Sequence, residues 1–438
     1  MKPQYAPKGS LIAALDIGSF KTACFLARTT DDEGNFEILG VGHQKSEGVK
    51  NGMIIDIDSA ETVIRKAVHA AEHMAKEHTK GYPLREVVVN MPATQTRSYG
   101  RTIDIQVNGH DITDRDLHSA LTRAQDDILD FEQNTSPSAQ GDQILGARRD
   151  LIHTIPVGYR IDGHGGITDP VGMNGEILSA DIHVISADQG TLKNLSHCTG
   201  QSHLDISAFC SPPYAAGLAS LVEDEMDLGC TIIDIGAGVT SFAVFHAGHM
   251  IYSDAIPVGG QHVTNDIATG LTTSLHDAER LKILYGNAIA SDLDETELID
   301  VPRLGETDRR DPNHVPRSLL IGIIQPRLEE VFELVRARLN DSGLGQTLGR
   351  RVVLTGGTSQ MSGIRDLANH VLDKQVRIGR PIRCPGLPDA VDDPAFACTA
   401  GMLTYAAAHT HEISGNLTKS MSAENIFQSI KLWLKDNW

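Results

Sequence analysis

The strongest constraint on the fold is a strand–turn–strand unit that occurs twice, about half the chain apart. The first copy spans residues 11–28 and turns at Gly18-Ser19, and the second spans residues 230–245 and turns at Gly236-Ala237-Gly238. A repeat this distant is too long for a solenoid and indicates that a whole lobe is duplicated. The chain has 438 residues, which is also too long for one ordinary core, so we expect two lobes with subdomains.

The segments around the repeats alternate between strand and helix patterns. Residues 59–77 carry apolar side chains at helical spacing, and strands are expected at 37–41 and 86–90. From about residue 94 to 180 short strands, a charged helix over 114–128 and a polar loop alternate, which predicts an inserted subdomain. We expect the strand 181–186 to resume the first lobe. A later strand, 351–354, leads into a helix over 363–372.

Three loops that follow apolar strands carry the candidate chemistry. They are Asp16-Ile17-Gly18-Ser19-Phe20-Lys21-Thr22, Asp234-Ile235-Gly236-Ala237-Gly238-Val239-Thr240 and Leu354-Thr355-Gly356-Gly357-Thr358-Ser359. In the first two, glycine and small hydroxyl residues allow backbone N–H groups to face an anion such as phosphate. The third has a Gly-Gly pair at a strand-to-helix turn, which suits the flat surface of an adenine and ribose.

Charged side chains in the two hairpins add a requirement for a metal. The carboxylates of Asp16 and Asp234 would repel phosphate directly, and Mg²⁺ with its water shell is the cation that bridges such groups. Lys21 adds a positive charge within reach of the phosphates. Each loop alone is weak evidence, and the order of hairpin, half-chain repeat and late Gly-Gly loop is what indicates a nucleotide site.

Composition excludes several other classes of protein. The net charge of −19 disfavours nucleic acid as a partner, because the phosphate backbone would be repelled. The six cysteines are scattered without zinc spacing, which is typical of buried thiols in a reducing compartment. We see neither a signal peptide nor an apolar run near 18 residues, so we expect a cytosolic chain whose membrane contact, if any, is peripheral.

The last residues have the pattern of an amphipathic helix. They follow a polar linker. At helical spacing, residues 424–438 have one apolar face, made by Ile426, Phe427, Ile430, Trp433, Leu434 and Trp438. Both tryptophans of the chain lie here, and tryptophan prefers the membrane interface. Fifteen residues make about 22 Å of helix, which is too short to span a bilayer, so the helix is expected to lie flat in the interface. The alternative is a helix docked on the protein itself or on a partner.

The order of these features resembles the actin, Hsp70 and sugar-kinase superfamily, and within it the FtsA family of bacterial cell-division actin homologues. The resemblance covers nearly the whole chain. It rests on ALDIGSFKTACFLAR, the run from Val41-Gly42 to Gly52, IPVGYRIDGHGGITDPVGMNGEILSADIHVIS, IIDIGAGVTSFAVF, IPVGGQHVTNDIATGL, DAERLKILYGNA and VVLTGGTSQMSGI. The most specific part is the stretch 155–173, because it belongs to the inserted subdomain.

The resemblance implies an α/β, actin-like ATPase fold with two ribonuclease-H-like lobes, an inserted subdomain and a C-terminal amphipathic helix. It implies ATP and Mg²⁺ as cofactors, with Mg²⁺ held through water by Asp16 and Asp234. The implied nucleotide-binding residues are Asp16, Gly18, Ser19 and Lys21 in the first hairpin, Asp234, Gly236, Gly238 and Thr240 in the second, and Glu279, Lys282, Gly356, Gly357 and Thr358 around the adenosine. For Glu279 and Lys282 a solvated i,i+3 charge pair is an equal alternative.

The resemblance also implies a division of the chain and a set of partners. The expected segments are the first lobe (8–85, 181–208 and 382–408), the inserted subdomain (86–180), the second lobe (209–256 and 321–381), a small subdomain (257–320), a linker (409–421) and the membrane-targeting helix (422–438). The small subdomain would receive the C-terminal tail of FtsZ, with Arg317 as a candidate contact. The insert would contact neighbouring copies and other division proteins.

The implied function is an ATP-binding polymer with at most slow ATPase activity, which tethers FtsZ filaments to the inner face of the cytoplasmic membrane at the division site. Two alternatives of similar fold stay open at this point. A sugar kinase or exopolyphosphatase needs a catalytic carboxylate in the cleft beyond those assigned to Mg²⁺, and the sequence offers none. A pilus-assembly adaptor should lack the tryptophan-rich terminal helix. A chaperone is disfavoured, because no β-rich substrate domain follows the lobes.

Overall fold

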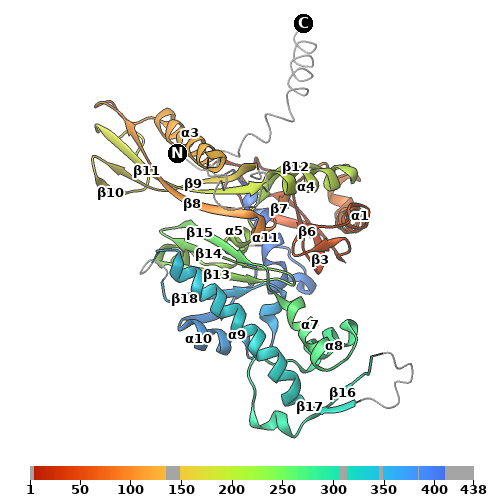
Figure 1. Cartoon of the computed structure of the whole chain (residues 1–438). Coiled ribbons are helices and arrows are strands. Elements are labelled where there is room, and N and C mark those ends of the chain that lie inside the picture. Colours follow the sequence, from red (N-terminus) through yellow and green to blue (C-terminus); the bar gives the residue numbers. More distant parts are fainter. Residues whose placement is uncertain (1–3, 135–147, 305–312, 345–348, 383, 410–438) are drawn as a thin grey trace. The chain divides into compact units, whose positions relative to one another are not determined.

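The computed structural model describes residues 4–134, 148–304, 313–344, 349–382 and 384–409 (Figure 1). These residues form two compact units. One is an insert within residues 95–193, and the other, the main unit, consists of residues 4–94 and 194–409. The boundary between the units falls inside α4 (Gln189–Gln201).

The first sheet of the main unit is built around the first repeat. Its strands are β2 (Leu11–Ile17), β3 (Lys21–Thr29), β4 (Phe36–Lys45), β7 (Glu86–Asn90) and β12 (Asp205–Cys210), in the order β12-β7-β2-β3-β4. The first three are antiparallel, and β7 and β12 add to β2 in parallel. Strands β2 and β3 are buried along almost their whole length, which explains why they read as continuous apolar runs.

The second sheet repeats this topology with the second hairpin at its centre. Its strands are β13 (Cys230–Ile235), β14 (Thr240–His246), β15 (His249–Ile256), β18 (Arg351–Thr355) and β19 (Gln375–Ile378), in the order β15-β14-β13-β18-β19. Again three antiparallel strands are followed by two parallel ones. The duplication predicted from the sequence is therefore a duplication of sheet topology, and the two lobes are ribonuclease-H-like as expected.

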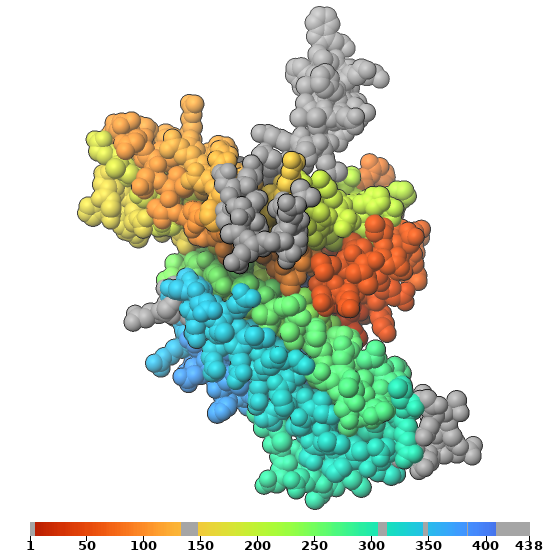
Figure 2. All heavy atoms as spheres, viewed as in Figure 1, coloured from red at the N-terminus to blue at the C-terminus, as the bar shows by residue number. Residues whose placement is uncertain are grey.

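Helices cover the sheets of both lobes. In the first lobe α1 (Ile57–Met74), followed by the short α2 (Lys76–Thr79), contacts β3 and β4, while α11 (Ala397–Ala407) contacts β2, β3 and α5 (Pro212–Ser220). In the second lobe one apolar core joins the sheet to α7 (Gly260–Gly270), α8 (Leu275–Tyr285), α9 (Arg317–Asp341) and α10 (Ile364–Leu372). Helix α6 (Glu223–Leu228) precedes β13. In Figure 2, α7 and α8 (green) and α9 (cyan) lie side by side on one face.

Small ladders complete the main unit. The pair β5 (Val49–Lys50) and β6 (Met53–Ile54) forms a hairpin, and β16 (Leu298–Val301) pairs with β17 (Asn313–Pro316). Near the ends of the described chain, β1 (Gln4–Tyr5) pairs with β20 (Ala408–His409). Among the described helices, none is both long and apolar enough to traverse a bilayer.

The insert is one antiparallel sheet covered by one helix. Strands β8 (Thr96–Gln106), β9 (Arg149–Ile161), β10 (His164–Ile167) and β11 (Ile177–Asp188) lie in the order β10-β9-β11-β8, and α3 (Asp114–Asn134) packs on one face over an apolar core. The expectation that the strand 181–186 resumes the first lobe is wrong. That stretch is part of β11, which pairs with β8 and β9, so it lies within the sheet of the insert. The apolar alternation of a strand does not reveal which sheet it joins.

Candidate functional site

The first hairpin is a tight turn between β2 and β3. The N–H of Gly18 donates to the carbonyl oxygen of Lys21 over 3.0 Å, which closes the turn. A Cβ atom on Gly18 would lie 2.8 Å from that same oxygen, so only glycine fits without a shift of the backbone. The strands pair Asp16 with Ala23 and Ile17 with Thr22, which fixes Asp16 at the end of β2 beside the turn.

The second hairpin has the same geometry. The N–H of Gly236 donates to the carbonyl oxygen of Val239 over 2.9 Å, and a Cβ atom on Gly236 would lie 2.9 Å from that oxygen. The tips of the two hairpins meet, because a Cβ atom on Gly238 would lie 2.6 Å from Ser19 Oγ. The structure therefore brings the two predicted phosphate loops together from opposite lobes of the main unit.

The two hairpin carboxylates lie close enough to affect each other's ionisation. Burial raises the pKa of Asp16, and Lys21 and a 3.1 Å hydrogen bond from Thr399 Oγ1 offset part of this rise. Burial and the neighbouring charge of Asp16 raise the pKa of Asp234 to about 7, while Lys21 acts in the opposite direction. A buried and a half-buried carboxylate with one ammonium group leave the site short of positive charge, and a bound cation would supply it.

Lys21 lies between these carboxylates and the short helix η6 (Pro394–Phe396). Its ammonium nitrogen is 3.3 Å from the centroid of the Phe396 ring and donates to the carbonyl oxygen of Ala395. Burial lowers the pKa of Lys21, and the charges of Asp16, Asp393 and Asp234 oppose that shift. Sequence reasoning missed Phe396 and Thr399, because no motif in residues 393–399 distinguishes them from ordinary core residues.

The residues present fit a hydrated magnesium ion. The described part of the chain contains no group of three or more His, Cys, Asp or Glu side chains that could hold a metal alone. Mg²⁺ does not need such a group, because it keeps several waters and is usually held by one or two carboxylates together with phosphate oxygens. Asp16 and Asp234 are the two carboxylates that would hold it.

The Gly-Gly loop lies directly against the second hairpin. Thr358 Oγ1 donates to the carbonyl oxygen of Gly236 over 3.1 Å. Gly356 has a φ of +84°, and a Cβ atom there would lie 2.2 Å from Asp234 Oδ1 and 2.6 Å from the carbonyl oxygen of Ile235. Gly357 has more room, since its Cβ atom would meet only Ala395 Cβ, at 3.6 Å. Any substitution of Gly356 thus disturbs the second hairpin itself, whether or not a nucleotide is bound.

Glu279 and Lys282 are joined to the second hairpin through the start of α7. Lys282 Nζ is 2.7 Å from Glu279 Oε2 and donates to the carbonyl oxygen of Gly260 over 3.1 Å. The N–H of Gly260 in turn donates to the carbonyl oxygen of Gly236 over 2.9 Å. The i,i+3 charge pair of the alternative is thus present, and its side chains are partly buried, at 12% exposed for Lys282 and 24% for Glu279. The Gly259-Gly260 pair was not predicted as part of the site, although its double glycine could have indicated it.

Two of the candidate hydroxyl groups already have protein partners. Thr240 is fully buried, and its hydroxyl donates to the carbonyl oxygen of Val258 over 2.8 Å. Ser19 Oγ accepts a hydrogen bond of 2.8 Å from the N–H of Gly52. The Thr240 hydroxyl therefore holds the base of the second hairpin, while the Ser19 hydroxyl keeps its own proton available for donation.

Comparison with known proteins agrees with this architecture. A sequence model for "Cell division protein FtsA" matches residues 231–401, and one for the "SHS2 domain inserted in FTSA" matches residues 93–186. The "Cell division protein FtsA" of Rhizobium meliloti (strain 1021) is 39% identical over 450 residues, which cover 100% of this chain and 97% of that protein. The chain belongs to the FtsA family. The FtsA of Bacillus subtilis (strain 168) is 32% identical, over 96% of this chain and 88% of that protein.

Solved structures with low sequence identity share the fold of this FtsA-family chain. The "PilM-PilN type IV pilus biogenesis complex" matches with a TM-score of 0.63 at 15% identity, covering 90% of this chain and 98% of that chain. "MreB5 of Spiroplasma citri bound to ADP" matches with a TM-score of 0.52 at 12% identity, covering 97% and 99%. At these identities the likeness establishes the actin-like fold alone.

Arg317, the candidate partner contact of this FtsA-family chain, lies outside the cleft and is held by its own subdomain. Its guanidinium is 3.2 Å from the buried carboxylate of Asp294 and 2.9 Å from that of Glu297, and its Nε donates to the carbonyl oxygen of Tyr285 over 2.8 Å. It therefore ties α8, η2 (Asp292–Glu295) and the start of α9 together. The candidate membrane residues Ile426, Phe427, Ile430, Trp433, Leu434 and Trp438 lie outside the described residues.

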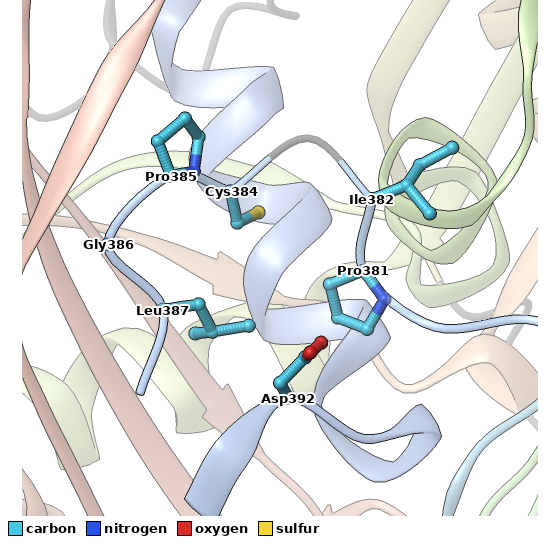
Figure 3. A pocket seen from close by; sticks show the side chains of 7 residues that line it. All are labelled: Pro381, Ile382, Cys384, Pro385, Gly386, Leu387 and Asp392. Carbon is cyan, nitrogen blue, oxygen red and sulfur yellow. The ribbon is translucent and has the colours of Figure 1, made fainter. Parts of the chain in front are cut away.

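A pocket of about 310 Å³ is lined by no residue of the three loops (Figure 3). It is formed where the chain returns from the second lobe to the first, and its lining residues are Pro381, Ile382, Cys384, Pro385, Gly386, Leu387 and Asp392. Only Asp392 is charged, and the remaining lining side chains offer no convergent polar groups that would orient a nucleotide. The point where the two hairpins meet is the better candidate for the FtsA-family site.

Proposed function

We propose that this chain binds ATP with Mg²⁺ between the two hairpins. The observation that carries the proposal is that two turns of equal geometry face each other and gather Asp16, Lys21 and Asp234 in one cleft. Backbone N–H groups of such turns bind phosphate oxygens, Lys21 adds positive charge, and the two carboxylates hold the metal. Glu279, Lys282, Gly357 and Thr358 would face the adenosine.

Replacement of Lys21 tests the nucleotide site. Lys21→Met keeps the length of the side chain and removes its charge, so the affinity for Mg-ATP should fall at least about ten-fold, as for loss of a hydrogen bond to a charged group. Titration calorimetry measures this. Lys374→Met is the matched control, because Lys374 Nζ also donates to one backbone carbonyl oxygen, that of Gly349, at 2.6 Å. If Lys21→Met binds Mg-ATP as tightly as the wild type does, the nucleotide does not bind between the hairpins.

We propose further that the C-terminal residues attach the chain to the cytoplasmic face of the cell membrane at the division site. Support comes from the sequence alone: an apolar face, both tryptophans, and a polar linker before them. Burial of the apolar side chains should dominate binding, since each large one contributes about 1.5–3 kcal/mol when fully buried and each lysine about 1 kcal/mol near an anionic surface.

A charge placed in the apolar face tests the membrane attachment. Trp433→Glu should release the protein from liposomes in a sedimentation assay and leave ATP binding unchanged. Gln428→Glu adds the same charge outside the apolar face and should still sediment. Membrane binding by Trp433→Glu as strong as that of the wild type, or loss of its nucleotide binding, would mean that the helix packs on protein instead.

The small subdomain is the proposed docking site for the C-terminal tail of FtsZ. Exposed leucines flank Arg317: Leu284 (58% exposed) precedes Tyr285, and Leu298 (63%) pairs with Pro316 across the β16–β17 ladder. Exposed apolar side chains around a fixed guanidinium suit a short peptide with apolar and acidic residues. Arg317 itself is a poor test residue, because its removal would leave the carboxylate of Asp294 buried without its cation.

Substitution of these leucines tests the docking site. Leu298→Glu should weaken binding of an FtsZ tail peptide by about ten-fold or more, since it removes apolar area and repels acidic residues. Leu228→Glu, at a 71% exposed leucine on α6, is the matched control and should bind as the wild type does. Fluorescence anisotropy with a labelled peptide measures both. Equal binding by the two variants would place the FtsZ contact elsewhere.

In this proposal the chain polymerises on the membrane, links FtsZ filaments to it, and recruits later division proteins through the insert. The proposed subdomain boundaries are those given by the sequence, with two exceptions. Strand β7 (Glu86–Asn90), expected in the insert, belongs to the sheet of the first lobe, and the strand around residue 181 belongs to the insert. A pilus-assembly adaptor and a small-molecule kinase are the alternatives. An adaptor should lack the terminal helix, so the liposome assay with Trp433→Glu tests that alternative. Turnover of a sugar or phosphate substrate would favour the kinase.

A further inference from the structure

The hairpin formed by β5 and β6 ends in a turn made of Asn51 and Gly52. Asn51 has a φ of +51° and Gly52 a φ of +78°, and the flanking residues Lys50 and Met53 pair across the ladder. Positive φ at both central residues is the two-residue turn that Asn-Gly favours, so the sequence builds a tight and well-defined tip. The resemblance to the FtsA family assigns no role to this tip, and neither Asn51 nor Gly52 is among the candidate site residues.

The tip reaches both phosphate hairpins. The N–H of Gly52 donates to Ser19 Oγ over 2.8 Å, which joins the tip to the first hairpin. A Cβ atom on Gly238 would lie 3.0 Å from both Cα and Oδ1 of Asn51, which places the tip against the second hairpin. Asn51 is half-buried, and among the residues that the structure describes its amide has no hydrogen-bond partner.

These contacts leave two donor groups at the point where the hairpins meet. Ser19 Oγ accepts from Gly52 N–H, so its own proton is available for an acceptor on the cleft side. The amide oxygen of Asn51 lies beside Gly238, and the NH2 group of the same amide offers two further N–H donors. Hydrogen bonds from such donors to an ionised phosphate are stronger than those between neutral groups.

We propose that the Asn51-Gly52 turn contacts the terminal phosphate of the bound nucleotide, so that the cleft distinguishes a triphosphate from a diphosphate. The inference rests on the proposed binding of ATP between the hairpins. The tip is the one element of the first lobe, besides the first hairpin, that touches Gly238 in the contacts above. A phosphate held by both hairpins would therefore have Ser19 and Asn51 beside it.

The base of the same hairpin is joined to a long helix. The carbonyl oxygen of Gly48 accepts from the N–H groups of Ile55, over 2.8 Å, and Asp56, over 3.1 Å. Asp56 is the N-cap of α1 and accepts from the hydroxyl of Ser59 over 2.5 Å. A change at the tip when the terminal phosphate leaves is thereby passed to the N-terminus of α1, which is a route from nucleotide state to the surface of the first lobe.

The test compares affinities for Mg-ATP and Mg-ADP in the full chain, by competition with a fluorescent nucleotide. Asn51→Asp keeps a residue that tolerates positive φ and places a negative charge at the tip, so affinity for ATP should fall about three- to ten-fold more than affinity for ADP. Asn51→Gly keeps the turn and removes the amide, and it should lower the ATP-to-ADP preference in the same direction.

The chain supplies a matched control in a second Asn-Gly turn. Asn108 and Gly109 in the insert have φ of +54° and +76°, and Asn108 is exposed, so Asn108→Asp makes the same chemical change in the same backbone conformation. Its affinities for both nucleotides should stay within about two-fold of the wild type, since Asn108 belongs to the other unit and a single exposed charge is screened by salt. Hydrogen exchange at Gly52 should slow with ATP more than with ADP.

The outcomes separate the two proposals. A wild type that binds neither nucleotide overturns the proposed function, and this inference with it. A wild type that binds ATP, together with Asn51 variants whose ATP-to-ADP preference is unchanged, overturns this inference alone. An Asn108→Asp variant that changes the preference as much as Asn51→Asp would also overturn it, because the effect would then not depend on the tip.

Discussion

Asp234 shows how the fold changes the chemistry of a single residue. Burial and the adjacent Asp16 raise its pKa to about 7, whereas an unfolded chain leaves an aspartate at its ordinary value of 3.8. In the pH range between these values the folded chain holds a proton that the unfolded chain has released. The free energy of unfolding should therefore fall as the pH rises through this range and level off above about pH 7.

Asp234→Asn removes this titration and should change the pH profile. We expect the melting temperature of the wild type, without nucleotide, to decline relative to that of the variant between about pH 5 and about pH 8. Scanning calorimetry in matched buffers measures the difference. Asp392→Asn, at an exposed aspartate, should follow the wild-type profile. Parallel profiles of wild type and Asp234→Asn would show that the Asp234 carboxyl titrates in its ordinary range.

At the scale of elements, the packing of α11 on α5 depends on one glycine. A Cβ atom on Gly401 would lie 1.7 Å from the carbonyl oxygen of Ala215, which is backbone and cannot rotate away. The two helices therefore approach more closely than any side chain at position 401 allows. Because α11 also carries Thr399, which donates to Asp16, this contact helps to position the cleft.

Two glycine-to-alanine substitutions in helices should thus have opposite effects. Gly401→Ala should lower the free energy of unfolding by more than about 2 kcal/mol, since overpacking typically costs 1–3 kcal/mol and here the clash is with backbone. Gly322→Ala in α9, where a Cβ atom meets nothing within 4 Å, should raise it by about 0.5–1 kcal/mol through helix propensity. Urea unfolding of both variants decides the matter. Similar shifts in the two would contradict the close approach.

At the scale of the whole main unit, the chain crosses between its lobes twice, and the crossings are bonded to each other. The N–H of Ile382, on the return crossing, donates to the carbonyl oxygen of Ala219 over 2.9 Å. Arg377 donates to the carbonyl oxygen of Ser220 over 2.8 Å and to Glu225. Movement of one lobe against the other must therefore occur around these two hydrogen-bonded crossings. The candidate site residues lie on both lobes.

The arrangement of carboxylates predicts slow ATP hydrolysis. Asp16 and Asp234 are assigned to the metal, and the carboxylate of Asp393 accepts from the N–H of Ala395 over 2.7 Å as the cap of η6. With the first two holding the metal and the third capping η6, none of the three is left as a general base for an attacking water. Turnover at saturating Mg-ATP should stay far below the enzyme median of about 10 s⁻¹, measured by phosphate release. A rate near that median, with ATP alone or with a sugar, would favour the kinase alternative.

The sequence by itself determined the local elements. The apolar runs at 11–17 and 230–235 gave β2 and β13, and the Gly-rich turns after them gave hairpins at the predicted positions. The helix predicted at 363–372 is α10 (Ile364–Leu372), and the one predicted at 114–128 continues to Asn134 as α3. These features follow from side-chain periodicity and turn chemistry, which act between residues close in the chain.

Only the tertiary structure decided which distant residues meet. Nothing in the sequence indicated that β11 joins the insert, that Phe396 and Thr399 reach the first hairpin, or that Asn51 lies against Gly238. The physical reason is that strand pairing and cleft contacts depend on the close packing of surfaces formed by segments far apart in the chain. A local pattern predicts that a strand or turn exists, whereas the packing of the core determines which segments that strand or turn contacts.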